Sequence, residues 1–377
     1  MKTFLLNVLR YATLPLALLY GIIVWLRNKL YDWGLSSSIQ FSLPVISVGN
    51  LTVGGTGKTP HIEYLIELLL PQYRVATLSR GYRRRTRGFL LANEQSDAHD
   101  IGDEPFQYHA KFPKLRVCVA EERMTAIPQL LQRQPNIQLI LLDDAFQHRS
   151  VKPGLNILLS DYNRMYTRDY IMPFGLLRES RKAAHRADVI VVSKCPEALS
   201  ETERDALLNE IAPLPHQQVF FSRMAYTRCY PLGQQSANLE EPCSVLLLTG
   251  IAQPEPLLAL AQSRYAFVHH LAYKDHHYFT RDDVEEMKAA FDSMPGKNKF
   301  ILTTEKDASR LHLIRDLLEP MGWPIYVQAI GVDILFHQED AFQQVVHDYL
   351  SPYFIEPETD LENDSQINTI IDPEIIL

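Results

Sequence analysis

Short runs of apolar and β-branched residues recur along the chain, and stretches with helical periodicity stand between several of them. Such runs, bounded by turn residues, are typical of buried strands. In the first half they lie at Val45–Val48, Val75–Leu78, Leu115–Val119, Leu139–Leu142, Leu155–Leu159 and Val189–Val192. The segment Thr59–Leu70 is one of the helical stretches between them. This alternation predicts an α/β fold, with a parallel sheet and helices on both of its faces.

A second set of patterns follows the polar stretch at 196–217. Strands are expected at Val219–Ser222, Val245–Thr249, Phe267–Leu271, Phe300–Thr304 and Ile325–Ile330. Helices are expected at Pro254–Ser263, Arg281–Met294 and Asp340–Leu350. We therefore divide the chain into a membrane-anchoring helix (1–36), a core domain (37–210), a smaller second α/β domain (211–351) and an acidic mobile tail (352–377).

The N-terminal segment, residues 4–27, is strongly apolar. The uncharged residues between Arg10 and Arg27 would span roughly 24 Å as a helix. This run is shorter than the roughly 20 residues that a full membrane crossing needs. Tyr20 and Trp25 suit a membrane interface, and the flanking basic residues favour anionic headgroups. The pattern favours a membrane anchor that spans the bilayer or lies in its interface. A cleaved signal peptide and a buried core helix are the alternatives.

The distribution of charge along the chain is uneven. The 377 residues carry a net charge of -8, and taken alone this total argues against nucleic acid and against an anionic membrane surface. However, residues 1–90 hold 11 Lys and Arg against 3 Asp and Glu. Much of the negative charge lies in 356–377, which has 7 acidic residues and no basic one. The front of the protein can therefore meet anionic partners despite the acidic total.

Hydrophobic residues make up 46% of the chain, which excludes wholesale disorder. The 4 cysteines are widely spaced and include no CxxC pair, so they suggest neither a zinc site nor a disulfide framework. We expect reduced, buried thiols of a cytosolic protein.

The strongest local motif is GNLTVGGTGKTP, from Gly49 to Pro60. It follows a β-branched run and opens a helical pattern, which is the context of a phosphate-binding loop. Such a loop turns backbone N–H groups toward phosphate oxygens, and the helix dipole adds to the attraction. Lys58 would reach the β- and γ-phosphates of a nucleotide, and the Thr59 hydroxyl would bind Mg²⁺. The loop itself is formed by Gly54, Gly55, Thr56, Gly57, Lys58 and Thr59.

The loop departs from the consensus G-x-x-x-x-G-K-[ST] at one position, because Thr52 stands where the consensus has glycine. The alternative without a function is an ordinary glycine turn before a helix. A second element supports the phosphate-binding interpretation: the apolar run Leu139–Leu142 ends in Asp143 and Asp144. An aspartate at the end of a neighbouring strand holds Mg²⁺ in such sites. Since adjacent residues of a strand point to opposite sides, we expect the two carboxylates to have separate roles.

Further polar clusters fall at predicted strand ends. The basic run Arg80–Arg87 follows a strand, and its guanidinium groups suit a phosphorylated substrate or lipid headgroups better than nucleic acid. A plain solvated loop is the alternative. Asp103, Arg178, Glu179 and His276 are candidate catalytic residues, and an aspartate oriented by a histidine is a credible base for a kinase. The adjacent histidine pairs at 269–270 and 276–277 are poor joint metal ligands.

These motifs, in this order, resemble those of the tetraacyldisaccharide 4′-kinases, the lipid A 4′-kinases of Gram-negative bacteria. The matching segments run from the loop to position 311 and are GNLTVGGTGKTP (49–60), SRGYRRR (79–85), GDEP (102–105), DDAFQHR (143–149), PFGLLRE (173–179), LTGIAQPE (248–255), DHHYF (275–279) and TTEKDASRL (303–311). Ala145 and Leu176 depart mildly from the family pattern, where glycine and proline are common. The N-terminal apolar segment also fits the family.

The resemblance implies a P-loop kinase that uses ATP and Mg²⁺ and phosphorylates the 4′-hydroxyl of a tetraacyl glucosamine disaccharide 1-phosphate. It implies that Asp103 is the catalytic base with His276 as its partner, and that Arg178 contacts phosphate. It further implies that Lys58 and Thr59 handle the ATP phosphates and Mg²⁺, and that the acids near the metal are Asp143, Asp144 and Glu179. The implied location is the cytoplasmic face of the bacterial inner membrane, with no nucleic acid and no obligate protein partner.

Other classes of protein fit the residues less well. A membrane-associated P-loop ATPase switch would phosphorylate nothing, but deviant-loop ATPases carry an additional lysine early in the loop, and 52–55 has none. A GTPase would show an Asn-Lys-x-Asp guanine reader, and the nearest segment, 192–196, lacks the aspartate. A scaffold with a vestigial loop would not need Lys58, Thr59 and both aspartates.

Overall fold

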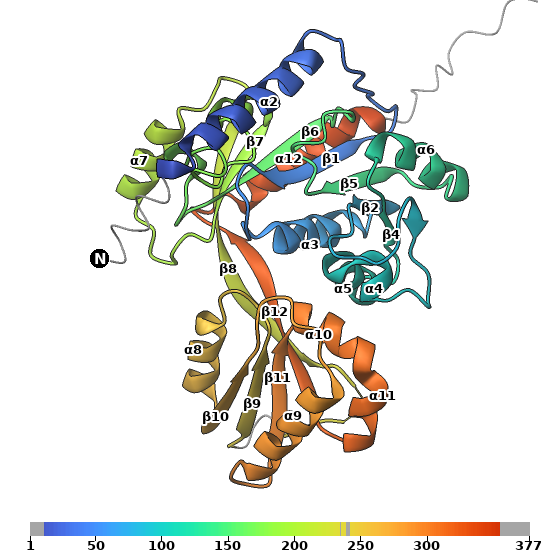
Figure 1. The fold of residues 1–377 in the computed structure, drawn as a ribbon, viewed down its shortest axis with the longest axis vertical. Coiled ribbons are helices and arrows are strands. Elements are labelled where there is room, and N and C mark those ends of the chain that lie inside the picture. The colour runs from blue at the N-terminus through green and yellow to red at the C-terminus, as the bar shows by residue number, and fades with distance from the viewer. Residues whose placement is uncertain (1–10, 234, 239–241, 355–377) are drawn as a thin grey trace, which may run out of the picture.

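The computed structural model describes residues 11–354, except 234 and 239–241. The segment before residue 11 and the acidic tail from 355 onward, on which two sequence predictions fall, lie outside the described residues. Figure 1 shows two lobes, the upper one larger, joined by a long two-stranded ribbon. The described strands run continuously from lobe to lobe in the order β10-β9-β11-β12-β8-β7-β6-β1-β5-β2-β4-β3.

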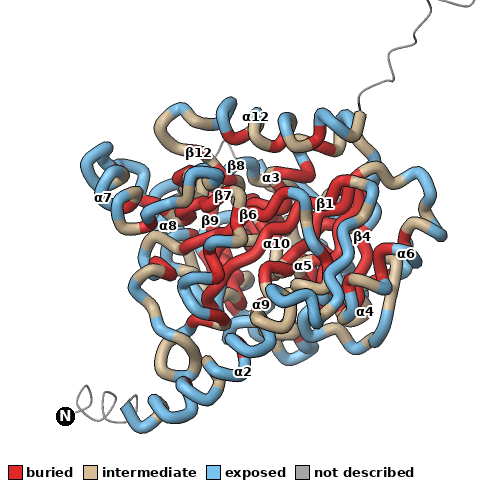
Figure 2. Tube along the Cα trace, turned by 90° about the horizontal axis from the view of Figure 1, so that it is seen from above, coloured by how far each residue is buried: buried red, intermediate tan, exposed pale blue. Residues whose placement is uncertain are grey.

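The upper lobe is built on a mostly parallel sheet, as the sequence predicts. Its strands are β1 (Val45–Asn50), β2 (Val75–Ser79), β3 (Leu90–Leu91), β4 (Arg116–Val119), β5 (Leu139–Asp143), β6 (Leu155–Asp161) and β7 (Val189–Ser193). All of these pairings are parallel except that of β3 with β4. The central strands are buried on both faces, which explains why they read as continuous apolar runs (Figure 2).

Helices pack on this sheet and connect its strands. They are α3 (Lys58–Leu69), α4 (Ala98–Ile101), α5 (Asp103–Lys111), α6 (Arg123–Arg133) and α7 (Glu201–Ile211), with 3-10 turns at η1 (Tyr166–Arg168) and η2 (Arg181–Arg186). Helix α3 buries Ile62, Leu65, Ile66 and Leu69, a spacing that places all four side chains on one face. This apolar face packs α3, the helix that follows the glycine-rich loop, against the sheet.

The lower lobe repeats the α/β arrangement on a smaller scale. Its strands are β9 (Ser244–Thr249), β10 (Phe267–Ala272) and β11 (Lys299–Thr304). Its helices are α8 (Glu255–Arg264), α9 (Arg281–Ser293), α10 (Glu305–Leu311) and α11 (Arg315–Leu318), with 3-10 turns η3 (His312–Ile314) and η4 (Glu319–Met321). The strands β10, β9, β11 and β12 are parallel neighbours.

The two lobes are joined by β8 (Gln218–Pro231) and β12 (Ile325–Ile334), which pair antiparallel along most of their length. One end of β8 pairs with β7 in the upper sheet. The sequence predicts the position of both strands but not their length or this pairing, because the polar half of each strand lies between the lobes and carries no apolar pattern.

After β12 the chain returns to the upper lobe. Helix α12 (Glu339–Leu350), followed by η5 (Ser351–Tyr353), inserts Phe342, Val346 and Leu350 into the core beneath β1. The Tyr349 hydroxyl donates to the carbonyl oxygen of Val45 at 3.2 Å and accepts from its N–H at 2.9 Å. Helix α12 therefore belongs to the core of the upper lobe, whereas the sequence-based division grouped 211–351 in one second domain.

Helix α2 (Leu14–Asp32) lies on the surface of the upper lobe. Its buried residues are Ala17 and Val24, so it is not the buried core helix that was one alternative. Large apolar side chains on its other faces are exposed; they are Leu14, Leu16, Leu18, Leu19, Ile22, Ile23, Trp25 and Leu26. Among the described residues, no helix is long and apolar enough to cross a membrane.

Candidate active site

The glycine-rich loop runs from the end of β1 to the start of α3, as the motif predicts. Gly57 precedes the helix with a φ of 80°, a left-handed conformation that glycine adopts without strain. A β-carbon at this position would lie 2.4 Å from the Met224 side chain. The loop thus leads directly into a helix N-terminus, a position whose backbone N–H groups commonly bind phosphate.

Thr52 is accommodated because the loop begins with extended backbone. It forms an isolated antiparallel bridge with Leu177, and the Val53 N–H donates to the carbonyl of Leu176 at 2.8 Å. The Arg178 N–H likewise donates to the Leu51 carbonyl at 2.7 Å. This pairing explains why position 52 needs no glycine, and it fastens the loop to the segment that carries Arg178.

Lys58 points toward the carboxyl edge of the sheet. Its ammonium group lies 3.3 Å from Oδ1 of Asn50, at the end of β1, and 3.5 Å from Oδ1 of Asp144. Arg178 approaches the same carboxylate, with its Nη1 3.0 Å from Oδ1. The predicted residues Lys58, Asp144 and Arg178 therefore form one charged cluster. Burial would raise the pKa of Asp144, but the two cations outweigh it and lower that pKa below its ordinary value.

Asp143 has a different environment from Asp144, as expected for adjacent carboxylates at a strand end. Asp143 ends β5 and accepts a hydrogen bond of 3.2 Å from the buried Tyr108 hydroxyl of α5. Burial, with a smaller contribution from the charge of Asp144, raises the pKa of Asp143 to about 6. Asp144 follows with a φ of 50°, which turns its side chain to Lys58 and Arg178.

Glu179 is fully buried and is held by two arginines. Its Oε1 lies 2.6 Å from Arg27 of α2, and its Oε2 lies 2.5 Å from Arg186 of η2. The Tyr20 hydroxyl of α2 also donates to the Arg178 carbonyl at 3.0 Å. Glu179 thus connects the surface helix to the segment that carries Arg178. The sequence-based prediction groups Glu179 with Asp143 and Asp144 as acids near the metal, but in the structure its carboxylate pairs with two guanidinium groups.

Asp103 and His276 meet although 173 positions separate them. Asp103 begins α5 in the upper lobe, and His276 follows β10 in the lower lobe. Oδ2 of Asp103 lies 3.1 Å from Nδ1 of His276, and Oδ1 is buried without a hydrogen-bond partner in the described part of the chain. Such a carboxylate, oriented by an imidazole and with one oxygen unengaged, is able to accept a proton.

The basic run Arg80–Arg87 lies beside this pair. The Tyr82 ring packs edge-on to His276, with centroids 6.0 Å apart. Arg84 turns inward and pairs with Glu121 at 2.5 Å, whereas Arg83 and Arg85 are exposed. The run therefore offers exposed guanidinium groups next to the candidate base, and Arg84 has a structural role that the sequence did not reveal.

Sequence reasoning missed Arg123, the first residue of α6. It is fully buried, yet its Nε and Nη2 have no hydrogen-bond partner among the residues described. Burial lowers its pKa to about 10, while the charges of Asp143 and Asp144 act in the opposite direction. Arg123 thus presents unpaired N–H groups close to the two aspartates, in a site whose expected ligand is a phosphate. Its only signal in the sequence is a position shortly after a predicted strand.

The oxygen donors at this edge fit Mg²⁺. Thr59 is buried, Tyr108 interacts with both Thr59 and Asp143, and Asp144 lies beside Lys58. Within the described ranges, His, Cys, Asp and Glu side chains form no cluster of three or more that could hold a metal ion by themselves. Mg²⁺ usually binds through one or two carboxylates together with water and substrate phosphates.

Comparison with known proteins identifies the family. The sequence model of the tetraacyldisaccharide-1-P 4′-kinase family, LpxK, matches residues 9–351. The chain belongs to this family. A tetraacyldisaccharide 4′-kinase of Bacteroides thetaiotaomicron is 44% identical over 350 residues, which cover 89% of this chain and 92% of the relative. One from Flavobacterium psychrophilum is 46% identical over 309 residues, 81% of this chain and 88% of that protein.

The fold is also similar to that of a solved LpxK. The crystal structure of LpxK from Aquifex aeolicus, described as an apo form in complex with ATP, matches with a TM-score of 0.70 and 26% identity. The match covers 91% of this chain and 99% of the Aquifex chain. The LpxK family resemblance expected from the motifs is therefore confirmed, and so is the kinase class.

Proposed function

We propose that this protein transfers the γ-phosphoryl group of ATP to the 4′-hydroxyl of a tetraacyl disaccharide 1-phosphate, a step of lipid A biosynthesis. The observation that carries this proposal is the Asp103–His276 pair, with its unengaged carboxylate oxygen, next to an ATP-type phosphate loop. The charge of the adjacent Glu104 contributes to the raised pKa of Asp143, which supports a position of the start of α5 near the proposed Mg²⁺ ligands.

In the proposed reaction, Oδ1 of Asp103 accepts the proton of the 4′-hydroxyl while the hydroxyl oxygen attacks the γ-phosphorus. The bond from the γ-phosphorus to the β,γ-bridging oxygen breaks, and ADP leaves with the bonding electrons. His276 orients Asp103 and stabilises its charge. Lys58, Arg178 and the unpaired N–H groups of Arg123 donate to the phosphate oxygens as charge develops on them.

We assign Mg²⁺ binding to Thr59, Asp143 and Asp144, with the remaining ligands from water and ATP. When bound, the ion neutralises the β- and γ-phosphate oxygens. Glu179 joins this set only by giving up an ion pair with Arg27 or Arg186. Release of Arg27 would loosen α2. Binding of Mg²⁺ by Glu179 in place of Arg27 would therefore couple the metal site to the surface helix.

We further propose that α2 lies in the cytoplasmic interface of the bacterial inner membrane. A row of exposed apolar side chains on a surface helix marks an interaction with a membrane or another protein. Beneath α2 is a cavity of about 410 Å³ lined by Lys29, Arg149, Lys182 and Arg186 and also by Asp32. Asp32 pairs with Lys29 and Arg149, and Glu179 pairs with Arg186. Apolar residues flanked by cations suit anionic lipid. The acceptor is itself a lipid, so a kinase must work at the membrane surface.

A transfer assay tests the proposed function. Purified protein is incubated with ATP labelled at the γ-phosphate and with tetraacyl disaccharide 1-phosphate in detergent micelles. We expect a labelled lipid whose new phosphate is at the 4′ position, and loss of the label with Lys58→Ala or Asp103→Ala. Hydrolysis of ATP without a labelled lipid would instead support the ATPase switch.

A further inference from the structure

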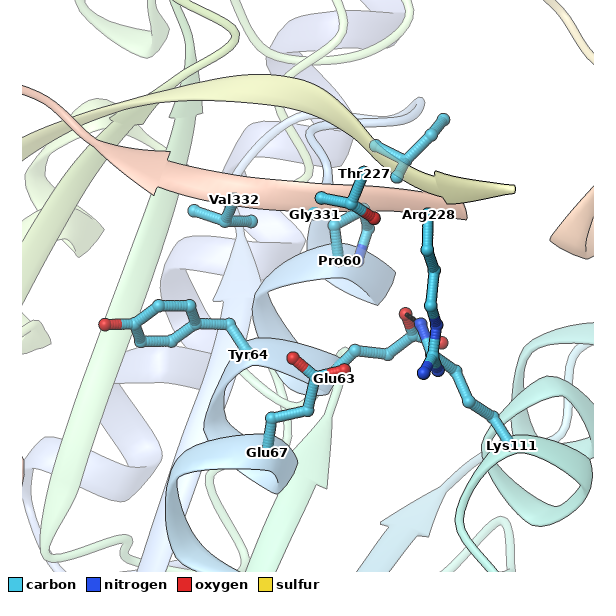
Figure 3. A pocket seen from close by; sticks show the side chains of 10 residues that line it. Pro60, Glu63, Tyr64, Glu67, Lys111, Thr227, Arg228, Gly331 and Val332 are labelled. Atoms are coloured by element: carbon cyan, nitrogen blue, oxygen red, sulfur yellow. Dashed lines mark hydrogen bonds and ion pairs between the residues drawn. The ribbon is translucent and has the colours of Figure 1, made fainter. Parts of the chain in front are cut away.

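A buried ion-pair cluster lies at the opposite end of α5 from Asp103. The ammonium group of Lys111, the last residue of α5, is 2.6 Å from Oε2 of Glu63 and 2.8 Å from Oε1 of Glu305. The Lys111 side chain is only 8% exposed, and both glutamates are buried. Figure 3 shows Glu63 on α3 and Lys111 on α5 at one side of a cavity beneath the β8–β12 ribbon.

Two of the three helices that meet at Lys111 begin with residues of the candidate active site, and the third belongs to the lobe that supplies another. Helix α3 begins at Lys58, and α5 begins at Asp103. Helix α10 begins at Glu305 and belongs to the lower lobe, which supplies His276. Lys111 is therefore a direct link between the phosphate loop, the helix of the proposed base and the lobe of its histidine partner.

Neighbouring contacts fix the geometry of this cluster. The Gln107 side chain donates to Oε1 of Glu63 at 2.8 Å, and the Ile330 N–H donates to Oε2 of Glu305 at 3.3 Å. The second contact ties the cluster to the ribbon between the lobes. Further along α10, Arg310 approaches Asp103, with Nε 3.9 Å from Oδ2. Helix α5 is thus held to α10 near both of its ends.

The charges within the cluster do not balance. One lysine faces two carboxylates, and burial, together with the charge of Glu305, raises the pKa of Glu63 to about 7. Apolar side chains of similar size often stabilise a fold as well as a buried ion pair does. What an apolar contact lacks is the directional geometry that sets the relative position of three helices.

We propose that Lys111 is a positioning residue for phosphoryl transfer, which holds α5 against α3 and α10 so that Asp103 is aligned with His276 and the acceptor hydroxyl. This inference rests on the proposed role of Asp103 as the base. Lys111 itself touches no reacting atom. Small displacements of a catalytic group are costly in rate, so loss of the cluster should lower kcat more than it weakens ATP binding.

The test uses a variant that removes the charges without leaving a buried charge unpaired. Lys111→Met combined with Glu63→Gln and Glu305→Gln preserves side-chain size, so we expect it to fold with a melting temperature close to that of the wild type. We expect its kcat for lipid transfer to fall about tenfold or more, with the KM for ATP changed by less than about threefold. Lys111→Arg keeps both ion pairs and should retain most of kcat. Lys114→Met, at an exposed position nearby, is the matched control and should change neither parameter.

A further comparison separates positioning from general structural damage. If Lys111 acts through Asp103, the triple substitution should lower the residual rate of Asp103→Ala by less than about twofold. A folded triple variant that keeps its kcat within about twofold would overturn the inference, as would a full additional loss of rate in the Asp103→Ala background. Transfer retained by Asp103→Ala alone would instead refute the proposed base, so the two failures are distinguishable.

Discussion

At the residue scale, the proposed chemistry depends on a carboxylate, that of Asp103, with two differently engaged oxygens. Oδ2 of Asp103 faces His276, whereas Oδ1 is buried and has no partner in the described part of the chain. In the proposed reaction, Oδ1 accepts the proton of the acceptor hydroxyl. We therefore expect Asp103 and His276 to contribute unequally to the rate.

We predict that Asp103→Asn lowers kcat for lipid transfer by about a hundredfold or more, because the amide cannot accept the proton. His276→Gln should cost less, about tenfold, because it removes only the partner that orients the carboxylate. The measurement is kcat at saturating ATP and lipid. His216→Gln, at an exposed position, serves as the control and should have wild-type activity. Equal losses for Asp103→Asn and His216→Gln would contradict the assignment.

The two aspartates at the end of β5 should respond to pH with opposite signs. The pKa of Asp143 rises from 3.8 to about 6 on folding, mainly through burial. Its ionisation therefore destabilises the fold by about 3 kcal/mol at neutral pH. This cost is absent below about pH 4, where the carboxyl is protonated in both states, and is complete once the pH exceeds 6.

We accordingly predict that Asp143→Asn increases the free energy of unfolding by about 1–3 kcal/mol at pH 8 in Mg²⁺-free buffer, and that this gain shrinks toward zero near pH 4. Urea denaturation at the two pH values measures it. Asp144→Asn is the contrasting control, because Lys58 and Arg178 lower the pKa of Asp144, and it should destabilise the protein at pH 8. A destabilised Asp143→Asn at pH 8 would refute the buried environment inferred for this carboxylate.

The basic run separates into two kinds of arginine. Arg84 is buried and paired with Glu121, whereas Arg83 and Arg85 are exposed beside the Asp103–His276 pair. We propose that the exposed guanidinium groups bind the existing phosphate of the lipid acceptor, and we predict that replacing Arg83 and Arg85 together by Gln raises the KM for this acceptor about fivefold or more. Arg84→Gln should instead lower the melting temperature. An unchanged lipid KM for the double variant would exclude the run from acceptor binding.

At the element scale, helix α2 combines a narrow buried face with a broad apolar surface. Ile22 is 61% exposed and Trp25 56%, whereas Val24 is 8% exposed. An interfacial helix buries such side chains among lipids, each contributing about 1.5–3 kcal/mol.

We predict that Leu18→Gln, Ile22→Gln and Trp25→Gln combined reduce binding to vesicles of anionic phospholipid by about tenfold or more, without lowering the melting temperature. Val24→Gln is the control within the same helix: it should destabilise the fold and leave vesicle binding of the folded protein unchanged. Cosedimentation with vesicles and thermal unfolding measure the two properties. Undiminished vesicle binding by the triple variant would show that α2 is not the membrane contact.

Most elements of the fold could be predicted from the sequence, because buried parallel strands read as apolar runs and helices show their period. The loop motif and the pair Asp143–Asp144 were placed correctly at one edge of the sheet, since carboxyl ends of parallel strands meet there. The pairing of β8 with β12 and the return of α12 could not be predicted, because they depend on contacts between distant segments. The same reason hid the Lys111 cluster, which joins three helices, and the burial of Arg123.

At the scale of the whole molecule, the proposed active site is assembled from both lobes. The upper lobe provides the phosphate loop, the two aspartates and Asp103, and the lower lobe provides His276. Lys306 of α10 also pairs with Glu104 of α5 at 3.0 Å, so the contact between the lobes continues along these helices. The ribbon of β8 and β12 is the covalent connection between them, and a relative movement of the lobes would open or close the Asp103–His276 pair.

The most direct test of the 4′-kinase assignment is the stoichiometry of the reaction. ADP release and labelled-lipid formation are measured together at saturating ATP, with and without tetraacyl disaccharide 1-phosphate. We predict about one 4′-phosphorylated lipid per ADP, little ADP without the acceptor, and loss of both products in Lys58→Ala. ADP formation that is independent of the acceptor and yields no phosphorylated lipid would contradict the assignment.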